Sequence, residues 1–352
     1  MRFPPAGLGL CALALLAACD VPTAAPKWDT KWDVPSKSTT ISVATLLPSG
    51  VSVTGNNAAF EVAVAPANIT NVLGADCPLC QAGNGSSMIK PQFQSIGSSS
   101  ASIPAKVVSA ASIHDTLVVT INNGYNFDPI RPSATQRGWL TIKAVSGGVL
   151  IAQDSLDGTA TALPAGAIVV RRLPVTGSVS GTTGIVVSTK LVSPPSDTAI
   201  SMDASRTLGF VAAVTSFLAS TADVTVSDQS VSASATTLDL TSISSGITDR
   251  LNSGSLVMNV TNPFSVAGTL SVKLTGPGVN IAKPFKLDGQ GNTVASKIDF
   301  TTEELKSLFG KLVNLTIDGS VSQTTTSVPV QPNQTVTIGT RLIVDVNAGS
   351  TK

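Results

Sequence analysis

The chain is poor in the side chains that most often carry out chemistry. Its 352 residues include one histidine, one tyrosine, three tryptophans and four cysteines, and 12% of its residues are charged. A single histidine limits both histidine-based zinc sites and general bases that titrate near neutral pH without a pKa shift. The chain also lacks a GxSxG nucleophile motif and a phosphate-binding glycine loop with its lysine. We therefore expect no catalytic residue, no metal site and no cofactor.

An excess of charge of either sign is also missing. The sequence has 22 basic and 21 acidic side chains, and one of the basic ones, Arg2, lies in the leader described below. Nucleic-acid binding requires clustered Lys and Arg that neutralise phosphates. The balanced charge excludes nucleic acid as a partner, and it argues against anionic surfaces.

No apolar run is long enough to cross a membrane. The run from Ala6 to Ala18 follows Arg2 and contains only small or aliphatic side chains. Spanning the hydrocarbon core of a bilayer takes about 20 apolar residues. A short apolar run after one basic residue is typical of a secretory signal peptide, and we predict one over residues 1–18.

The end of this run has a second feature. Leu16, Ala17, Ala18 and Cys19 resemble the bacterial lipobox. The resemblance implies cleavage before Cys19 and acylation of its thiol, and it implies a place in the cell envelope on the outside of the cytoplasmic membrane. Two or three acyl chains, at about 0.8 kcal/mol per buried methylene, are enough for stable anchoring. Asp20 leaves the choice between inner and outer membrane open, and an ordinary signal peptide with a chance cysteine is the alternative.

Residues 19–37 are predicted to form a tether. Three prolines and little apolar surface favour an extended linker. Trp28 and Trp32 either sit at the membrane interface or dock on the first domain, and docking is favoured because WDVP leads directly into TTISV. The opening resembles that of uncharacterised β-rich envelope lipoproteins.

The rest of the chain has the composition of strands. Hydrophobic residues make up 42% of the sequence and aromatic residues 4%, and β-branched residues alternate with Ser and Thr. Five short segments recur in the same order, which indicates an internal repeat. They are LVVTINN (from 117) with LVMNVTN (256), LTIK (140) with LSVK (270), SLDG (155) with KLDG (286), GSVS (177) with GSVS (319), and TKL (189) with TRL (340).

We accordingly predict a mostly β protein with two related immunoglobulin-like β-sandwich domains. The boundary is placed at Pro194 and Pro195, giving domains over 38–193 and 194–352. One continuous sheet built from both copies is the structural alternative. Two short helices are expected, one from Thr301 to Val313 with capping-box spacing and one over the apolar residues 205–220.

Cys77 and Cys80 form a lone CPLC motif. Outside the cytoplasm a disulfide is the default for such a pair. A redox pair requires a strand-to-helix context, and the residues after Cys80 predict no helix. Free thiols and a partial metal site are the remaining alternatives.

His114 and the Asp-Gly pairs complete the candidates for chemistry. His114 stands beside Asp115 at the start of a predicted strand, where a turn histidine is favoured over a member of a Ser-His-Asp triad. DSLDG and KLDG supply too few oxygens for a Ca²⁺ site, and Asp-Gly favours hairpin turns.

Residues 256–289 resemble the late embryogenesis abundant type 2, or water-hypersensitivity, domain. The likeness rests on a strand that runs into the Asn-Pro turn of Asn262 and Pro263, whereas the first copy has Asn122, Asn123 and Gly124 there. It implies a small β-sandwich and an association with stress tolerance, and it brings no catalytic residues.

These features favour a non-enzymatic envelope protein, held to the membrane through lipid on Cys19, with a structural role or a protein partner in the envelope. The alternative is a carrier of an apolar ligand bound between the helix that starts near Thr302 and the segment around Phe210. An envelope enzyme is the third hypothesis. No specific small-molecule ligand is indicated.

Overall fold

The computed structural model describes residues 29–112, 115–214, 217–289 and 293–347. In these ranges the protein is mostly β, with several antiparallel sheets and few short helices, which confirms the predicted class. None of the described helices is long and apolar enough to cross a membrane.

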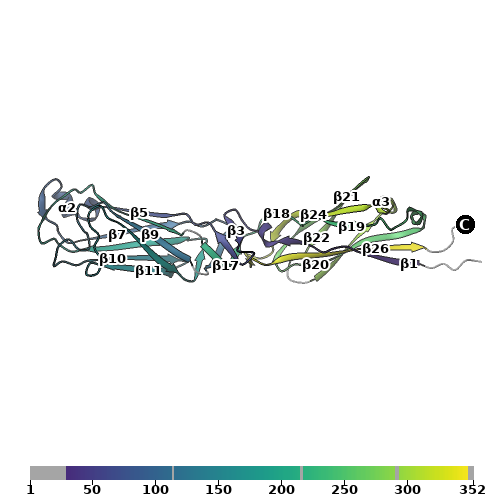
Figure 1. The fold of residues 1–352 in the computed structure, drawn as a ribbon, viewed down its shortest axis with the longest axis horizontal. Coiled ribbons are helices and arrows are strands. Elements are labelled where there is room, and N and C mark those ends of the chain that lie inside the picture. The colour runs from purple at the N-terminus through teal and green to yellow at the C-terminus, as the bar shows by residue number, and fades with distance from the viewer. Residues whose placement is uncertain (1–28, 113–114, 215–216, 290–292, 348–352) are drawn as a thin grey trace, which may run out of the picture.

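Eight strands form two four-stranded sheets, which we call the first sheet pair (Figure 1). Their orders are β12-β9-β16-β5 and β11-β10-β14-β7. Burial alternates along the strands, so that Leu117, Val119 and Ile121 of β9 are all at most 1% exposed and line the core between the sheets. The strands are β5 (Ala67–Val72), β7 (Phe93–Ala101), β9 (Asp115–Asn123), β10 (Trp139–Ser146), β11 (Val149–Asp157), β12 (Ile168–Val175), β14 (Ile185–Ser193) and β16 (Thr207–Val214).

The second sheet pair is built in the same way. Its sheets have the orders β1-β26-β20-β23 and β18-β24-β21-β22, with β2 also pairing with β26 and β19 with β24. The strands are β1 (Asp29–Pro35), β2 (Thr39–Ser42), β18 (Gln229–Ser232), β19 (Thr236–Asp239), β20 (Leu251–Thr261), β21 (Val266–Gly276), β22 (Val279–Leu287), β23 (Thr293–Phe300), β24 (Leu312–Gln323) and β26 (Thr335–Asn347).

The two sheet pairs have one topology. Matching their sheet orders pairs β5 with β1, β7 with β18, β9 with β20, β10 with β21, β11 with β22, β12 with β23, β14 with β24 and β16 with β26. Both sets of strands follow chain order, so the structure repeats as the sequence does. Strand β1 precedes the whole first sheet pair, whereas β18 to β26 follow it, and the first copy is therefore nested inside the second.

Two buried asparagines mark equivalent positions in the copies. Asn123 accepts a hydrogen bond at Oδ1 from Tyr125 N (3.0 Å) and donates from Nδ2 to Phe127 O (2.9 Å). Asn262 does the same with Phe264 N (3.0 Å) and Val266 O (3.0 Å). The asparagine before Gly124 in the first copy thus makes the same turn-forming hydrogen bonds as the asparagine before Pro263 in the second. The sequence analysis had treated the first copy as a departure from the Asn-Pro pattern.

Three of the five matched segments lie in equivalent strands, namely β9 and β20, β10 and β21, and β11 and β22. The other two do not. GSVS falls in β13 (Ser178–Ser180) and in β24, and the TKL and TRL segments fall in β14 and β26. These two matches were wrong because short alternations of Val, Leu, Ser and Thr suit any half-buried strand.

A fifth sheet lies between the two sheet pairs (Figure 1). Its order is β13-β8-β17-β4-β3, and β25 also pairs with β17. The strands of the two sheet pairs lie in separate sheets, so the described residues do not form the one continuous sheet that was the alternative. The remaining elements are β3 (Val51–Thr54), β4 (Ala59–Val62), β6 (Ser87–Ile89), β8 (Val107–Ser112), β15 (Ala199–Ser201), β17 (Phe217–Val224), β25 (Val328–Val330), α1 (Leu73–Asp76), α2 (Pro78–Ala82), α3 (Thr302–Leu308), η1 (Val43–Thr45) and η2 (Ser245–Arg250).

The strand pairing does not change at Pro194 and Pro195, where we predicted a boundary. Strand β16 pairs with β5 and β9, and β17 pairs with β4 and β8 and also with the short β25, so both strands pair mainly with the first half of the chain. The helix predicted over 205–220 is wrong for the same reason. In β16 burial alternates from one residue to the next, which places Leu208, Phe210 and Ala212 in the core.

Part of the predicted tether is a strand. Residues 29–35 form β1, which pairs along its whole length with β26, from Asp29 opposite Asn347 to Pro35 opposite Arg341. Trp32 and Val34 are half-buried against the core. Trp32 therefore docks, as predicted, but on the second sheet pair rather than the first. Trp28 lies outside the described residues.

The capping box of α3 is confirmed. Thr301 Oγ1 accepts from Glu304 N (3.2 Å), and Glu304 Oε2 accepts from Thr301 N (2.8 Å). The helix is shorter than predicted, because Phe309 is already extended (φ −69°, ψ 148°) and Gly310 follows it with a φ of +72°. Leu312, which falls within the predicted helix, instead starts β24 and is 53% exposed.

Candidate functional site

Two of the sequence candidates, Cys77 and Cys80, lie at one end of the molecule. Helices α1 and α2 follow β5 and lie at the end of the first sheet pair that is farthest from β1 (Figure 1). We call this end the tip. It holds the two cysteines, a buried lysine and three aromatic rings.

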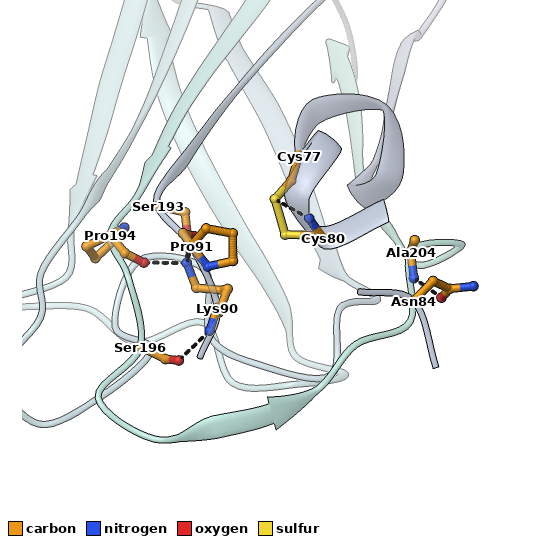
Figure 2. The surroundings of a disulfide bond; sticks show 9 residues. All are labelled: Cys77, Cys80, Asn84, Lys90, Pro91, Ser193, Pro194, Ser196 and Ala204. Atoms are coloured by element: carbon orange, nitrogen blue, oxygen red, sulfur yellow. Dashed lines mark hydrogen bonds between the residues drawn. A yellow bond between two sulfur atoms is a disulfide. The ribbon is translucent and has the colours of Figure 1, made fainter. Parts of the chain in front are cut away.

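Cys77 and Cys80 form a disulfide in the structure (Figure 2). Cys77 caps α2, with Cys80 N donating to Cys77 Sγ (3.1 Å). The residues PLCQA form helix α2, although we predicted no helix after the motif. Proline at the first helical position, here Pro78, favours the start of a helix. Thiol exchange requires that a thiolate reach a sulfur, and Cys77 and Cys80 are 2% and 0% exposed. The geometry is that of a structural clamp.

Lys90 is the most unusual residue of the tip, since it is fully buried. Its Nζ donates to Pro91 O (3.1 Å), to Ser193 Oγ (2.9 Å) and to the carbonyl of Pro194, and its backbone N donates to Ser196 Oγ (2.9 Å; Figure 2). These bonds tie the start of β7 to the end of β14, about a hundred residues away. The Pro194 region, where we predicted a domain boundary, is thus fixed to the core.

Two aromatic rings lie beside this ammonium group, and a third packs against them. Nζ lies 4.9 Å from the ring centroid of Phe93 and 5.4 Å from that of Phe127. Tyr125 stacks on Phe127 with centroids 5.3 Å apart. Faces of aromatic rings attract cations, and no carboxylate among the described residues forms an ion pair with Lys90. Rings and carbonyl oxygens thus take the place of a counter-ion.

Burial dominates the electrostatics of the tip. It lowers the pKa of Lys90 to about 7. It also raises the pKa of the Tyr125 hydroxyl, an effect to which the nearby Asp76 carboxylate adds. Within the described part of the chain the Tyr125 hydroxyl has no hydrogen-bond partner, while Asp76 accepts from Ser95 Oγ (2.6 Å). A lysine with a lowered pKa can act as a base or form an imine, but only where a substrate reaches it. Lys90 is enclosed, and its role is structural.

The remaining sequence candidates do not assemble into a reactive cluster. His114 and Cys19 lie outside the described residues. Asp115, the acid beside His114, accepts from Ser112 Oγ (2.5 Å) and from Leu218 N (2.7 Å), and so joins β9 to β17. Asp157 of the first Asp-Gly pair accepts from Thr159 N (2.8 Å), as in a turn. The described residues contain no group of three His, Cys, Asp or Glu side chains that could hold a metal ion.

The arrangement expected for an apolar-ligand carrier is not formed. Phe210 is a core residue of β16 in the first sheet pair, whereas α3 packs on β20 and β22 of the second. Leu305 and Leu308 of α3 are fully buried in that contact. The two segments that were expected to flank one cavity belong to different parts of the fold.

Comparisons with known proteins assign no family to the chain. No family model and no curated protein matches the chain, so the likeness of residues 256–289 to the water-hypersensitivity domain stays a resemblance. One similar solved structure is a crystal structure of a protein from Parabacteroides distasonis that is described as a candidate secreted protein. The two chains share 9% identity with a TM-score of 0.34, and the match covers 90% of this chain and 99% of the other.

Proposed function

We propose that the protein is a non-enzymatic lipoprotein of the cell envelope, anchored through lipid on Cys19, which holds the tip away from the membrane for contact with a protein partner. In this proposal the sheet pairs are two related immunoglobulin-like β-sandwich domains, one nested within the other. The protein is exported and its Cys19 thiol is acylated, as the lipobox-like residues before Cys19 imply.

The observation that carries the proposal is the place of β1. Strand β1 starts at Asp29, opposite Asn347 near the end of β26, so both described chain ends lie at the end of the molecule opposite the tip (Figure 1). Only nine residues separate Cys19 from Asp29, and a chain of that length spans at most about 30 Å. An anchor on Cys19 therefore keeps the second sheet pair near the membrane and the first one distal.

The nested order of the two sheet pairs suits a protein that is anchored at one end and presents the other end. Because β1 pairs with β26 over its full length, a pull on the anchor is borne by a continuous ladder that joins the first described strand to the last. The described residues offer no metal-binding cluster, and the enclosed Lys90 has no route to a substrate. These features support a structural or binding role over catalysis.

The anchor is tested by metabolic labelling with radioactive palmitate in a bacterial host that processes lipoproteins. We expect label in the wild-type protein and none in Cys19→Ala, which should also leave the membrane fraction. Cys11→Ala is the matched control, because Cys11 lies within the same leader, and it should label normally. An unlabelled wild-type protein would overturn the anchor.

The partner is tested by photo-crosslinking in intact envelopes. A crosslinking amino acid at Leu79, which is 65% exposed on α2 at the tip, is compared with one at Lys306 on α3. The proposal predicts one reproducible adduct from Leu79 and none from Lys306. Absence of an adduct from the tip, or equal adducts from both positions, would refute presentation of the tip to a protein partner.

A further inference from the structure

The outer surface of sheet β12-β9-β16-β5 holds a row of exposed apolar side chains, and we call this surface the Val211 face. Val211 of β16 is 45% exposed, and Val170 and Ile168 of β12 are 51% and 67% exposed. Val170 and Val211 both lie opposite Thr120 of β9, so they stand in one row across the sheet. Ile168 stands two residues before Val170 and points to the same side. Apolar side chains that gather in one exposed patch mark binding surfaces, whereas scattered ones do not.

Charge is almost absent from the Val211 face. Alternate residues of the four strands point outward, and among those that the structure describes Arg172 is the only charged one. Arg172 belongs to β12, at the edge of the sheet, and it shares its row with Val118 and Ala213. The polar residues at the centre of the face are Thr120 and Asn122, which are uncharged. The centre therefore offers no charge that selects an ion or a charged polymer.

The equivalent surface of the second sheet pair carries charges of both signs. Val118 of β9 and Val257 of β20 stand five residues before the matched asparagines, which aligns the two surfaces. In the rows of Val257 and of its outward neighbour Ser255, the charged residues are Asp33, Lys297, Asp299 and Arg341. They form two ion pairs, Lys297 with Asp299 (2.9 Å) and Arg341 with Asp33 (3.3 Å). The matching described rows of the first copy hold Arg172 as their only charged residue.

The next row differs in the size of its apolar side chains. Val170 and Val211 flank β9 in the first copy, whereas Ala295 and Gly339 lie opposite Asn259 at the equivalent place of the second. The same arrangement of strands thus forms with small side chains on this surface. Because the fold does not require the larger ones, a partner that covers the Val211 face explains them.

We infer that the Val211 face packs against the same face of a second copy of the chain, forming a dimer with two-fold symmetry. In such an interface each patch meets itself, and a face with a neutral centre sets no like charges opposite each other. Homodimer interfaces are also more apolar than other protein interfaces, and their cores are poor in charge. The two faces pack as the sheets of a β-sandwich do, about 10 Å apart and with nearly aligned strands.

The direction of the strands determines how the two copies lie. The strands of this sheet run along the long axis of the molecule (Figure 1). A two-fold axis parallel to them places β12 of one copy across from β5 of the other, so the two Arg172 side chains lie at opposite rims. The same axis brings both tips to one end and both β1 strands to the other. Two copies held in one membrane by the proposed anchor can therefore form this dimer side by side.

Other occupants fit the Val211 face less well. Surfaces that lie on a membrane carry Trp and Tyr at the headgroup level and Lys or Arg around the apolar area. Among the outward residues of the described strands, Arg172 is the only one of these types. Interfaces with unrelated proteins are enriched in Tyr, Trp, Met and Arg, whereas this face is built from Val, Ile, Thr and other small side chains.

The size of the face indicates a weak dimer. Four strands with about seven residues each cover roughly 20 Å by 20 Å, from a strand spacing of about 4.8 Å and a rise of about 3.3 Å per residue. Such an area lies at the low end of specific interfaces, so we expect a Kd of about 1 to 100 μM. Copies that share one membrane meet at a higher effective concentration, which favours the dimer there.

The test is sedimentation velocity of the full chain in detergent at protein concentrations below and above about 10 μM. We expect the mass to rise from that of one chain to that of two. Val211→Lys sets two ammonium groups near the axis and should weaken association at least about ten-fold. Gly339→Lys is the matched control, because it adds the same charge at the equivalent position of β26, where a Cβ meets no atom closer than 3.7 Å. It should associate like the wild type, and circular dichroism checks that both variants keep the fold.

A photo-crosslinking amino acid at Val211 identifies the occupant in intact envelopes. We expect an adduct with the mass of two chains, and none from the same amino acid at Gly339. Cys19→Ala should dimerise in detergent like the wild type, because the inference does not depend on the anchor. A chain that stays monomeric at every concentration, or lysine variants that both associate or both fail to, would overturn the inference. Adducts from Val211 with lipid or with a different protein, in place of the two-chain adduct, would overturn it in favour of that occupant.

Discussion

Lys90 permits a pH experiment whose sign and size follow from its surroundings. Burial lowers its pKa from 10.5 to about 7 in the folded protein. Between these values the unfolded chain binds more protons than the folded one, so the free energy of unfolding rises with pH. The cost of burial is fully present below pH 7 and disappears above pH 10.5. The slope is about 1.4 kcal/mol per pH unit, which amounts to about 4 kcal/mol between pH 6 and pH 10.

The perturbation is Lys90→Met, which keeps the length of the side chain and removes its titration. Urea unfolding of both proteins is followed at several pH values through the fluorescence of Trp139, with Trp28 and Trp32 replaced by Phe so that only the first sheet pair is observed. The free energy of unfolding of the wild type minus that of the variant should rise by about 4 kcal/mol from pH 6 to pH 10. Comparing two proteins at each pH removes the contribution of all other groups.

The three oxygens that accept from Nζ work in the opposite direction, because they stabilise the ammonium form. If they offset burial completely, the difference between the two proteins will be constant over this pH range, and the dominance of burial at Lys90 is refuted. Lys106→Met is the control, since Lys106 is exposed. Its difference from the wild type should not change with pH over the same range.

Three further predictions concern single contacts. Asn123→Ala removes the acceptor of Tyr125 N and the donor to buried carbonyls, so urea unfolding should show a loss of about 3 kcal/mol, against little change in the exposed Asn122→Ala. Thr301→Ala removes the N-cap of α3 and should cost about 1 kcal/mol by thermal unfolding, with Thr302→Ala as the control. Reducing the Cys77–Cys80 disulfide opens a very short loop, so calorimetry with and without reductant should differ by about 2 kcal/mol, and a loss above about 5 kcal/mol would contradict a purely local clamp.

The β class and the repeat could be predicted because they follow from patterns of neighbouring residues in the sequence. Alternation such as that of Leu117, Val119 and Ile121 specifies a strand with one buried face, and Thr301 with Glu304 specifies a helix start. Residues 205–220 failed because a short apolar run with few polar positions fits a buried strand as well as a helix. Its partners β5 and β9 settle the choice, and they lie far away in the sequence.

The nesting of the first sheet pair within the second could not be predicted from sequence patterns. Only Trp32 and Val34 of β1 face the core, and the partner strand β26 begins about three hundred residues later. Lys90 was missed because lysine is almost always at the surface, and its acceptors come from the far end of β14.

The proposed function depends above all on an anchor that holds the tip away from the membrane. This geometry is tested most directly by fluorescence quenching on liposomes that contain a quencher-labelled lipid, with the dye attached through a non-natural amino acid at Lys31 of β1 or at Ala82 of α2. Both positions are exposed. We predict strong quenching at Lys31 and none at Ala82 in the acylated protein. Equal quenching at the two positions, or stronger quenching at Ala82, would contradict the proposed orientation.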